Sequence, residues 1–217
     1  MAEYVLTATK NHARLGSFYD RIEGFYDLTF KLNGYGRSLD QYFEAHPLPV
    51  FPGCSVLEAG CGTGTLTMAL LRNLKVPVKL TALDLSASSM ATARKYVDKN
   101  NPSGQPVRFA QGNALALPFA DEAFDLVATS GVLEYLPLDE GLSELARVIA
   151  PGGHLLHLPM RPTPVASFLE MLFRLKVHPP HEVSETTDKY FQVVSHYRFP
   201  RFQPISWSKT AVLAQKV

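Results

Sequence analysis

A chain of 217 residues suits one ordinary domain with a sizeable core, and its 46% hydrophobic content favours folding over disorder. Its 21 Lys and Arg against 20 Asp and Glu leave a net charge of +1, which argues against a basic nucleic-acid-binding surface and against a polybasic membrane anchor. No apolar run approaches the roughly 18–20 residues that span a bilayer, and the first residues lack a secretory signal pattern, so we expect a cytoplasmic chain.

Short apolar runs alternate with amphipathic stretches through the centre of the chain. The runs predict five buried strands, at 55–60, 79–85, 106–112, 124–130 and 154–158. Helical spacing of apolar residues predicts helices at 65–74, 87–100 and 138–149, the second of them capped by Ser86. This alternation predicts a parallel sheet with helices on both faces.

Two cysteines, Cys54 and Cys61, flank the first predicted strand. An extended segment rises about 3.3 Å per residue, which holds these two residues farther apart than the roughly 7 Å between alpha-carbons that a disulfide tolerates. We therefore expect two free thiols in a reducing compartment and no zinc framework.

The two ends of the chain differ from the centre in aromatic content. Of 23 aromatic residues, 10 precede Cys54 and 8 follow Met160. Residues 12–30 and 165–177 predict apolar-faced helices, and residues 193–199 and 207–216 predict an antiparallel strand pair at a sheet edge. The aromatic flanks either pack on the sheet or wall a lid over a pocket, and both can hold. We divide the single domain (1–217) into a helical cap (1–53), a core (54–159), a lid insertion (160–191) and the final strand pair (192–217).

A glycine-rich turn follows the first strand and opens the first helix, with the sequence V-L-E-A-G-C-G-T-G at 56–64. Glycines there permit a tight turn and a close approach of a ligand to the backbone. The next strand ends at Asp84, whose carboxylate can accept hydrogen bonds from both ribose hydroxyls of a nucleoside. The dinucleotide fingerprint G-x-G-x-x-G fails here, because Thr65 occupies its sixth position.

The acidic-x-G-x-G-x-G spacing instead resembles motif I of class I methyltransferases, which use S-adenosylmethionine (SAM). Three further segments are similar to the family's ribose-binding strand end (82–86), its adenine loop and fourth strand (111–125), and its L-x-R-V-L-x-P-G-G segment (145–153). The resemblance covers residues 55–159, about half of the chain. It implies a Rossmann-like α/β fold with a seven-stranded, mostly parallel sheet, a reversed final strand, and helices on both faces. It also implies a helical lid from the N-terminus and from the 160–191 insertion.

The resemblance implies a SAM site at the carboxyl ends of the strands. The acidic residue of motif I would orient the methionine ammonium, the glycine backbone would lie under the methionine and ribose, and the aspartate would hold the ribose. Leu85 would pack on the adenine and residues 113–114 would contact its edge, although Asn113 replaces the Asp of most relatives. Ser130 would lie near the sulfonium, and Tyr26 would close over the methionine carboxylate. The expected cofactor-binding residues are Tyr26, Glu58, Gly60, Gly62, Gly64, Asp84, Leu85, Asn113, Ala114 and Ser130.

Methyl transfer from SAM depends on alignment and on exclusion of water, and it needs a base only if the acceptor must lose a proton. Glu134 and Tyr135 follow strand four, where the family places substrate-facing residues, and His157 lies at the end of strand five. These three are our candidate catalytic residues, although a histidine can equally serve packing alone. His178 and His181 suggest a metal pair, but prolines between them disfavour one shared helix, so we expect no metal.

The segment 18–27 resembles the opening of small-molecule methyltransferases, including quinone C-methyltransferases and bacterial phospholipid N-methyltransferases. In the quinone C-methyltransferases a longer motif follows this opening. Of that motif this chain keeps only Tyr26, Asp27 and Gly36. The resemblance implies methylation of a small, apolar or aromatic acceptor, lipid-like or quinone-like, with transient membrane contact left open. Two alternatives remain. One is a non-catalytic SAM-binding partner subunit, and the other is an NAD-type oxidoreductase, which Thr65 disfavours.

Overall fold

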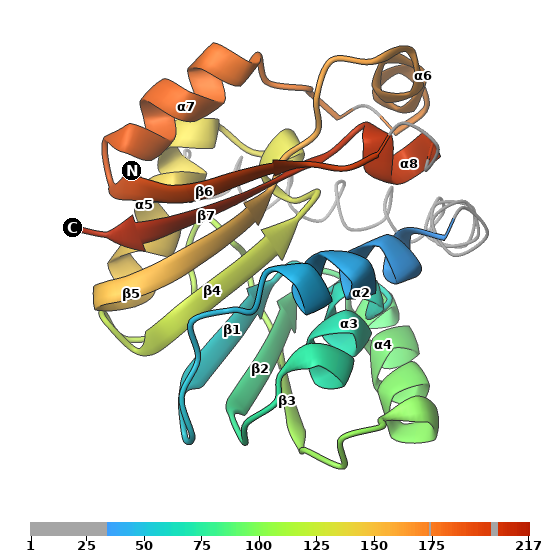
Figure 1. The fold of residues 1–217 in the computed structure, drawn as a ribbon, viewed down its shortest axis with the longest axis vertical. Helices are drawn as coiled ribbons and strands as arrows, with labels where there is room; N and C mark the ends of the chain where they lie inside the picture. The colour runs from blue at the N-terminus through green and yellow to red at the C-terminus, as the bar shows by residue number, and fades with distance from the viewer. Residues whose placement is uncertain (1–33, 174, 201–203) are drawn as a thin grey trace, which may run out of the picture.

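The computed structural model describes residues 34–173, 175–200 and 204–217 (Figure 1). The predicted helix at 12–30, and with it Tyr26, lies outside these ranges.

Seven strands form one sheet in the order β3-β2-β1-β4-β5-β7-β6. Strands β1 to β5 pair in parallel, whereas β7 runs antiparallel to both β5 and β6. This arrangement confirms the predicted mixed sheet with a reversed final strand. The strands are β1 (Ser55–Ala59), β2 (Lys79–Asp84), β3 (Val107–Gln111), β4 (Phe124–Ser130), β5 (Ile149–Leu158), β6 (Phe191–Arg198) and β7 (Thr210–Lys216).

Helices cover both faces of the sheet, as predicted. Neighbouring residues of β1 show the two sides, since Val56 packs in one buried cluster with residues of α2, α3 and α4, while Leu57 packs in another with residues of α5 and α7. Figure 1 shows the same two groups of helices on opposite sides of the strands. The helices are α2 (Tyr35–Ala45), α3 (Thr65–Asn73), α4 (Ala87–Asn100), the 3₁₀ turn η1 (Leu133–Tyr135), α5 (Leu138–Val148), α6 (Pro164–Phe173), α7 (Pro180–Asp188) and α8 (Pro204–Trp207).

Strand β5 and helix α6 differ from their predicted bounds. Strand β5 begins at Ile149, five residues before the predicted start, because Ile149 already pairs with Phe124 of β4. Helix α6 ends at Phe173, short of residue 177. The backbone N–H of Val177 donates instead to the Glu170 carboxylate at 2.6 Å, which ties the chain down after the helix.

Among the described residues, the helices α2, α7 and α8 and the 3₁₀ turn η1 were not predicted as separate elements, and α8 ends at Trp207, where the last strand was expected to begin. In α2, apolar side chains recur at Tyr35, Leu39, Tyr42 and Phe43, a helical spacing that buries one face against α3. Helix α7 begins at Pro180, and a proline fits there because the first turn of a helix needs no intrahelical N–H donor.

Aromatic residues from both flanks of the chain pack on each other. The Tyr42 ring of α2 lies 5.2 Å from that of Tyr197 and 5.8 Å from that of Phe199 (centroid distances). For these residues the packing interpretation of the aromatic flanks is therefore confirmed. Cys54 and Cys61 are both buried free thiols, as predicted. Among the residues that the structure describes, no helix is long and apolar enough to cross a bilayer.

Candidate functional site

The register of the three central strands brings the predicted SAM-site residues to one edge of the sheet. Ala59, the last residue of β1, pairs with Leu83 of β2 and with Thr129 of β4. Gly60, Asp84 and Ser130 follow these three residues directly, so the turn, the acidic strand end and the end of β4 are neighbours. This is the carboxyl edge, where ligands bind in open parallel sheets.

The glycines of the turn serve different physical purposes. Gly60 has φ +81°, and a Cβ on it would lie 1.8 Å from Val132 Cγ2, so a larger residue would collide with the segment after β4. A Cβ on Gly62 (φ +50°) would meet no atom of the described residues within 4 Å, so these residues leave its backbone open to a ligand. Gly64 has φ +91° and lies so close to Ala93 that it lets α3 pack on α4.

Asp84 holds the turn through its carboxylate. Oδ2 accepts from the backbone N–H of Gly62 at 2.7 Å, and Oδ1 accepts from the N–H of Ser86 at 2.9 Å. A carboxylate has about four acceptor sites, so Asp84 can also accept from donors beyond these two backbone groups. The carboxylate that we expect to bind the ribose therefore also fixes the backbone of the glycine turn.

Glu58 is completely buried on β1, beneath the same turn. Its Oε2 accepts from the Thr67 hydroxyl of α3 at 2.5 Å, but its Oε1 has no hydrogen-bond partner among the described residues. Burial raises the pKa of Glu58 to about 8, and the nearby charge of Asp84 adds to the rise. A buried carboxyl oxygen without a donor is costly unless a further group, such as an ammonium, completes it.

The predicted adenine side is built from the ends of β2 and β3. Leu85 is half-buried, and its carbonyl accepts from the Gln111 side chain at 3.0 Å. Asn113 forms a turn in which its Oδ1 accepts from the backbone N–H of Leu115 at 2.9 Å, and Ala114 is 9% exposed. Asn113 thus has a structural role in this turn, and its amide NH₂ still carries donors for a ligand.

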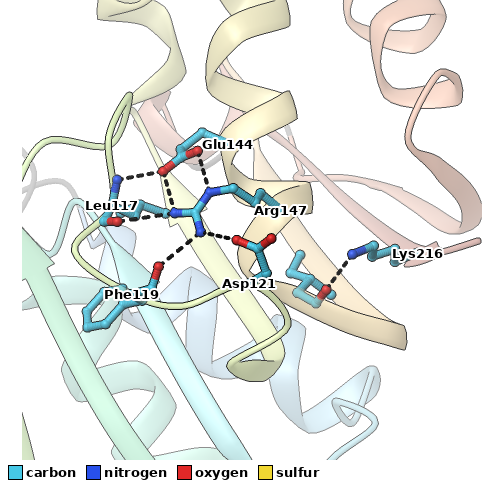
Figure 2. A network of polar contacts seen from close by, with 7 residues as sticks. Leu117, Phe119, Asp121, Glu144, Arg147 and Lys216 are labelled. Atoms are coloured by element: carbon cyan, nitrogen blue, oxygen red, sulfur yellow. Dashed lines mark hydrogen bonds and ion pairs between the residues drawn. The ribbon is translucent and has the colours of Figure 1, made fainter.

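Arg147 of the L-x-R-V segment ties the loop after that turn to α5 (Figure 2). Its guanidinium donates to the carbonyls of Leu117 and Phe119 and to the carboxylates of Glu144 and Asp121, at 2.6–3.2 Å. These charged contacts raise the pKa of Arg147 above its usual range. The segment's arginine thus holds the loop that follows the adenine-side residues.

A tyrosine that the sequence prediction missed lies at the same edge. The Tyr35 hydroxyl is 2.8 Å from the Ser130 hydroxyl, and Tyr35 is 3% exposed. Burial raises the pKa of Tyr35 above its usual range, so it stays a neutral phenol. The helical spacing of Tyr35 with Leu39 and Tyr42 was a usable sign of a helix here, although no pattern indicated the Ser130 contact.

The three candidate catalytic residues differ in their surroundings. Glu134 is 3% exposed, and its Oε1 accepts from the backbone N–H of Met160 at 2.7 Å while its Oε2 has no partner among the described residues. Tyr135 is half-buried and packs against the cluster of α6 that contains Met160 and Leu169. His157 is 2% exposed within β5, and neither ring nitrogen has a hydrogen-bond partner in the described part of the chain.

Burial keeps His157 neutral. Burial is the main cause that lowers the pKa of His157 to about 3, and the nearby Lys209 and His178 contribute to the same shift. By strand alternation His157 shares a sheet face with Leu155, which packs toward α5 and α7, whereas Ser130 shares the opposite face with Ala128. The structure therefore separates His157 from Ser130 by a face of the sheet.

The two histidines considered as a metal pair diverge. His178 is buried, with contacts to Glu182 Oε1 (3.0 Å) and to the Leu133 carbonyl (3.2 Å), whereas His181 is exposed on α7. Within residues 34–173, 175–200 and 204–217, no group of three or more His, Cys, Asp or Glu side chains could hold a metal ion.

The site fits SAM on three features of its own geometry. Glu58 Oε1, which has no donor in the described part of the chain, matches an ammonium donor, and Asp84 has acceptor capacity for ribose hydroxyls. No described atom crowds the backbone of Gly62, so a ligand can approach it closely. The Gly60 turn opens α3 directly, as nucleoside-binding turns of such sheets do.

Comparisons with known proteins agree with this geometry. A family model described as a methyltransferase domain matches residues 56–153. The chain is 33% identical over 163 residues to the ubiquinone/menaquinone biosynthesis C-methyltransferase of Hahella chejuensis (73% of this chain, 65% of the relative). It is 32% identical over 158 residues to the demethylmenaquinone methyltransferase of Thermus thermophilus (69% of this chain, 67% of the relative). The chain thus spans about two thirds of the length of these relatives.

A solved structure gives the same fold with little sequence identity. The geranyl diphosphate C-methyltransferase of Streptomyces coelicolor, in complex with Mg²⁺, geranyl diphosphate and S-adenosylhomocysteine, superimposes with a TM-score of 0.66 at 17% identity, covering 83% of this chain and 80% of that one. From the motifs, the sheet and these relatives together, the chain belongs to the class I SAM-dependent methyltransferase family.

Proposed function

We propose that this chain transfers a methyl group from SAM to a small, apolar or aromatic acceptor, quinone-like or lipid-like. The observation that carries the proposal is the buried Glu58, whose Oε1 has no donor among the described residues and which lies two residues before the glycine turn that Asp84 contacts from the next strand. The two relatives named above act on quinones by their names, which supports this class of acceptor.

Each residue of the site has a proposed role in holding the cofactor. Glu58 binds the methionine ammonium, and the backbone of Gly60, Gly62 and Gly64 shapes the floor under the methionine and ribose. Asp84 accepts from the ribose hydroxyls, and Leu85, Asn113 and Ala114 enclose the adenine. Ser130, oriented by Tyr35, lies beside the sulfonium. Tyr26, outside the described residues, is proposed to close over the methionine carboxylate.

Bound SAM supplies a methyl carbon on a positively charged sulfur, and the protein's task is to align an acceptor and keep water out. We propose Glu134 and Tyr135 as acceptor-facing residues. The Glu134 Oε2, which has no partner among the described residues, supports this proposal. His157 was expected to face the acceptor as well, but it shares the sheet face opposite to Ser130, so we propose that its neutral ring packs in the core.

The acceptor site is proposed to form between the core and two lids, the N-terminal cap (1–53) and the 160–191 insertion. Helix α6 of the insertion leaves Phe168 55% and Met171 75% exposed. An acceptor that dissolves in lipid is reached from a membrane surface, so we propose that this helix face makes transient contact with lipid. The fraction of protein that sediments with phosphatidylglycerol vesicles should fall in the variant Phe168→Ser. The control variant Val194→Ser, at an equally exposed position on β6, should sediment as the wild type does.

We place the chain in the cytoplasm, where its two buried thiols would stay reduced.

Transfer of radioactivity from methyl-labelled SAM tests the function. Incubation with lipid and aqueous small-molecule extracts should label an apolar product, and a Gly62→Val variant should label none. A protein that binds S-adenosylhomocysteine but labels nothing would instead be a non-catalytic partner subunit. Binding of NADH in place of S-adenosylhomocysteine would indicate an oxidoreductase.

A further inference from the structure

Lys209 is a fully buried lysine directly before β7. Its ammonium donates to the Leu158 carbonyl at 3.3 Å and lies 5.8 Å from the centroid of the Tyr35 ring. An ammonium carries three N–H donors, so this carbonyl uses one of them. Burial lowers the pKa of Lys209, because a cation removed from water is disfavoured.

Glu134 supplies the opposite charge nearby. Its Oε1 accepts from the backbone N–H of Met160, and Met160 is paired with Lys209 in an antiparallel bridge. The charge of Glu134 opposes the fall in the pKa of Lys209, yet none of the ion pairs between described residues joins the two side chains. Each charge therefore keeps hydrogen-bonding capacity that the other does not use.

Lys209 lies near the residue that we propose beside the sulfonium, since the Tyr35 ring is close to Lys209 and the Tyr35 hydroxyl contacts Ser130. The Leu158 carbonyl that holds Lys209 belongs to the residue paired with Ser130 at the end of β4. Ser130 is the residue proposed beside the sulfonium. Burying two opposite charges that do not contact each other carries a desolvation free energy that no ion pair offsets. A ligand group that hydrogen-bonds to both side chains would offset this penalty.

Building on the proposed methyltransferase function, we propose that Lys209 and Glu134 bind a phenol- or enol-type hydroxyl group of the acceptor. The hydroxyl oxygen accepts from the Lys209 ammonium, and the hydroxyl hydrogen is donated to Glu134 Oε2. When the hydroxyl ionises, its proton moves to Oε2, the O–H electron pair stays on the acceptor oxygen, and Lys209 stabilises the resulting negative charge.

This donor and acceptor pattern discriminates against other groups. An aromatic amine is neutral at pH 7 and can donate to Glu134, but its delocalised lone pair is a poor acceptor for the Lys209 ammonium. A carboxylate would bring a second anion to Glu134. An ether can accept from Lys209, but it leaves Glu134 Oε2 without a donor. A buried charged acceptor left unpaired weakens binding by about tenfold to a hundredfold.

Equilibrium dialysis of the full chain, saturated with S-adenosylhomocysteine, tests the proposal with three probes of one shape: 1-naphthol, 1-methoxynaphthalene and 1-naphthylamine. The wild type should bind 1-naphthol about tenfold or more tightly than the other two. Lys209→Met and Glu134→Gln should each abolish that preference. The matched control is Lys216→Met, because Lys216 lies at the other end of β7 and its ammonium also donates to a carbonyl, that of Ile149, at 2.7 Å.

Each alternative result has a distinct meaning. Equal binding of the three probes by the wild type, or an unchanged preference in Lys209→Met, would overturn the hydroxyl site. If Lys209→Met does not fold, the probe preference of Glu134→Gln tests the proposal instead. This variant should fold, because the amide oxygen of glutamine can still accept from the backbone N–H of Met160. Affinity for S-adenosylhomocysteine should stay unchanged in both variants. Failure of the wild type to bind S-adenosylhomocysteine would instead overturn the proposed function on which this site rests.

Discussion

The hydroxyl groups of Tyr35 and Ser130 lie 2.8 Å apart, and this contact joins the first residue of α2 to the last residue of β4. It positions an N-terminal helix against the edge of the sheet where the SAM-site residues meet. The contact spans 95 positions of sequence, so it joins two segments that only the tertiary fold brings together.

Replacing Tyr35 with phenylalanine should therefore destabilise the domain. The ring remains, but Ser130 loses its partner, and the free energy of unfolding should fall by about 1 kcal/mol in urea titrations. The control is Tyr42→Phe on the same helix, where ring packing against Tyr197 and Phe199 is kept and a smaller change is expected. Equal losses in the two variants would show that the Tyr35–Ser130 contact contributes nothing.

Glu58 should make the free protein less stable as the pH rises. Its pKa is about 8 in the folded state against 4.5 in the unfolded state, so the folded state binds more protons between these values. The stabilisation is fully present below pH 4.5 and is lost as the pH rises through 8. Relative to Glu58→Gln, the free energy of unfolding of the wild type should fall by up to about 1.4 kcal/mol per pH unit in that window. A pH-independent difference between the two proteins would contradict a buried, protonated Glu58.

His157 should make the protein less stable as the pH falls. Its pKa is about 3 when folded against 6.5 when unfolded, so the unfolded state binds more protons between these values. Its contribution is complete above pH 6.5 and is lost as the pH falls toward 3. His157→Leu should remove this acid sensitivity, whereas His181→Leu, at an exposed position, should retain it. Urea titrations at pH 7 and pH 5 measure the difference.

The Arg147 contacts shown in Figure 2 should matter more than an ordinary surface ion pair. Arg147→Met removes hydrogen bonds to two carbonyls and two carboxylates, and we expect a loss of about 1–2 kcal/mol in the free energy of unfolding. The control is Lys189→Met, whose exposed contact with Asp139 should contribute little. If both variants unfold alike, Arg147 does not hold the loop after the adenine-side residues.

Much of the central fold was predictable because its signals are local. Val56 and its apolar neighbours mark a buried strand, and Gly60 marks the turn that the close approach of Val132 requires. The parallel direction of β1 to β5 followed from the alternation of strands and helices. Helix α7 was missed because Pro180 was interpreted as a barrier, although the first turn of a helix accepts proline.

Only those site residues that belong to a sequence motif could be predicted. Asp84 and Glu58 followed from the glycine-rich turn, but nothing in the sequence indicated that Glu58 Oε1 would lack a partner. Lys209 could not be found in the sequence, because a single lysine before a strand is almost always exposed. Its burial results from tertiary packing between the ends of β5 and β7 and the first residue of α2.

Calorimetric titration with S-adenosylhomocysteine tests the central claim, that the edge formed by Glu58, the glycine turn and Asp84 holds SAM. The wild type and the control Asp98→Ala, at an exposed position on α4, should bind with the same affinity. Asp84→Ala should bind at least about tenfold more weakly, because it loses charged hydrogen bonds to the ribose. Wild-type affinity in Asp84→Ala would contradict the account.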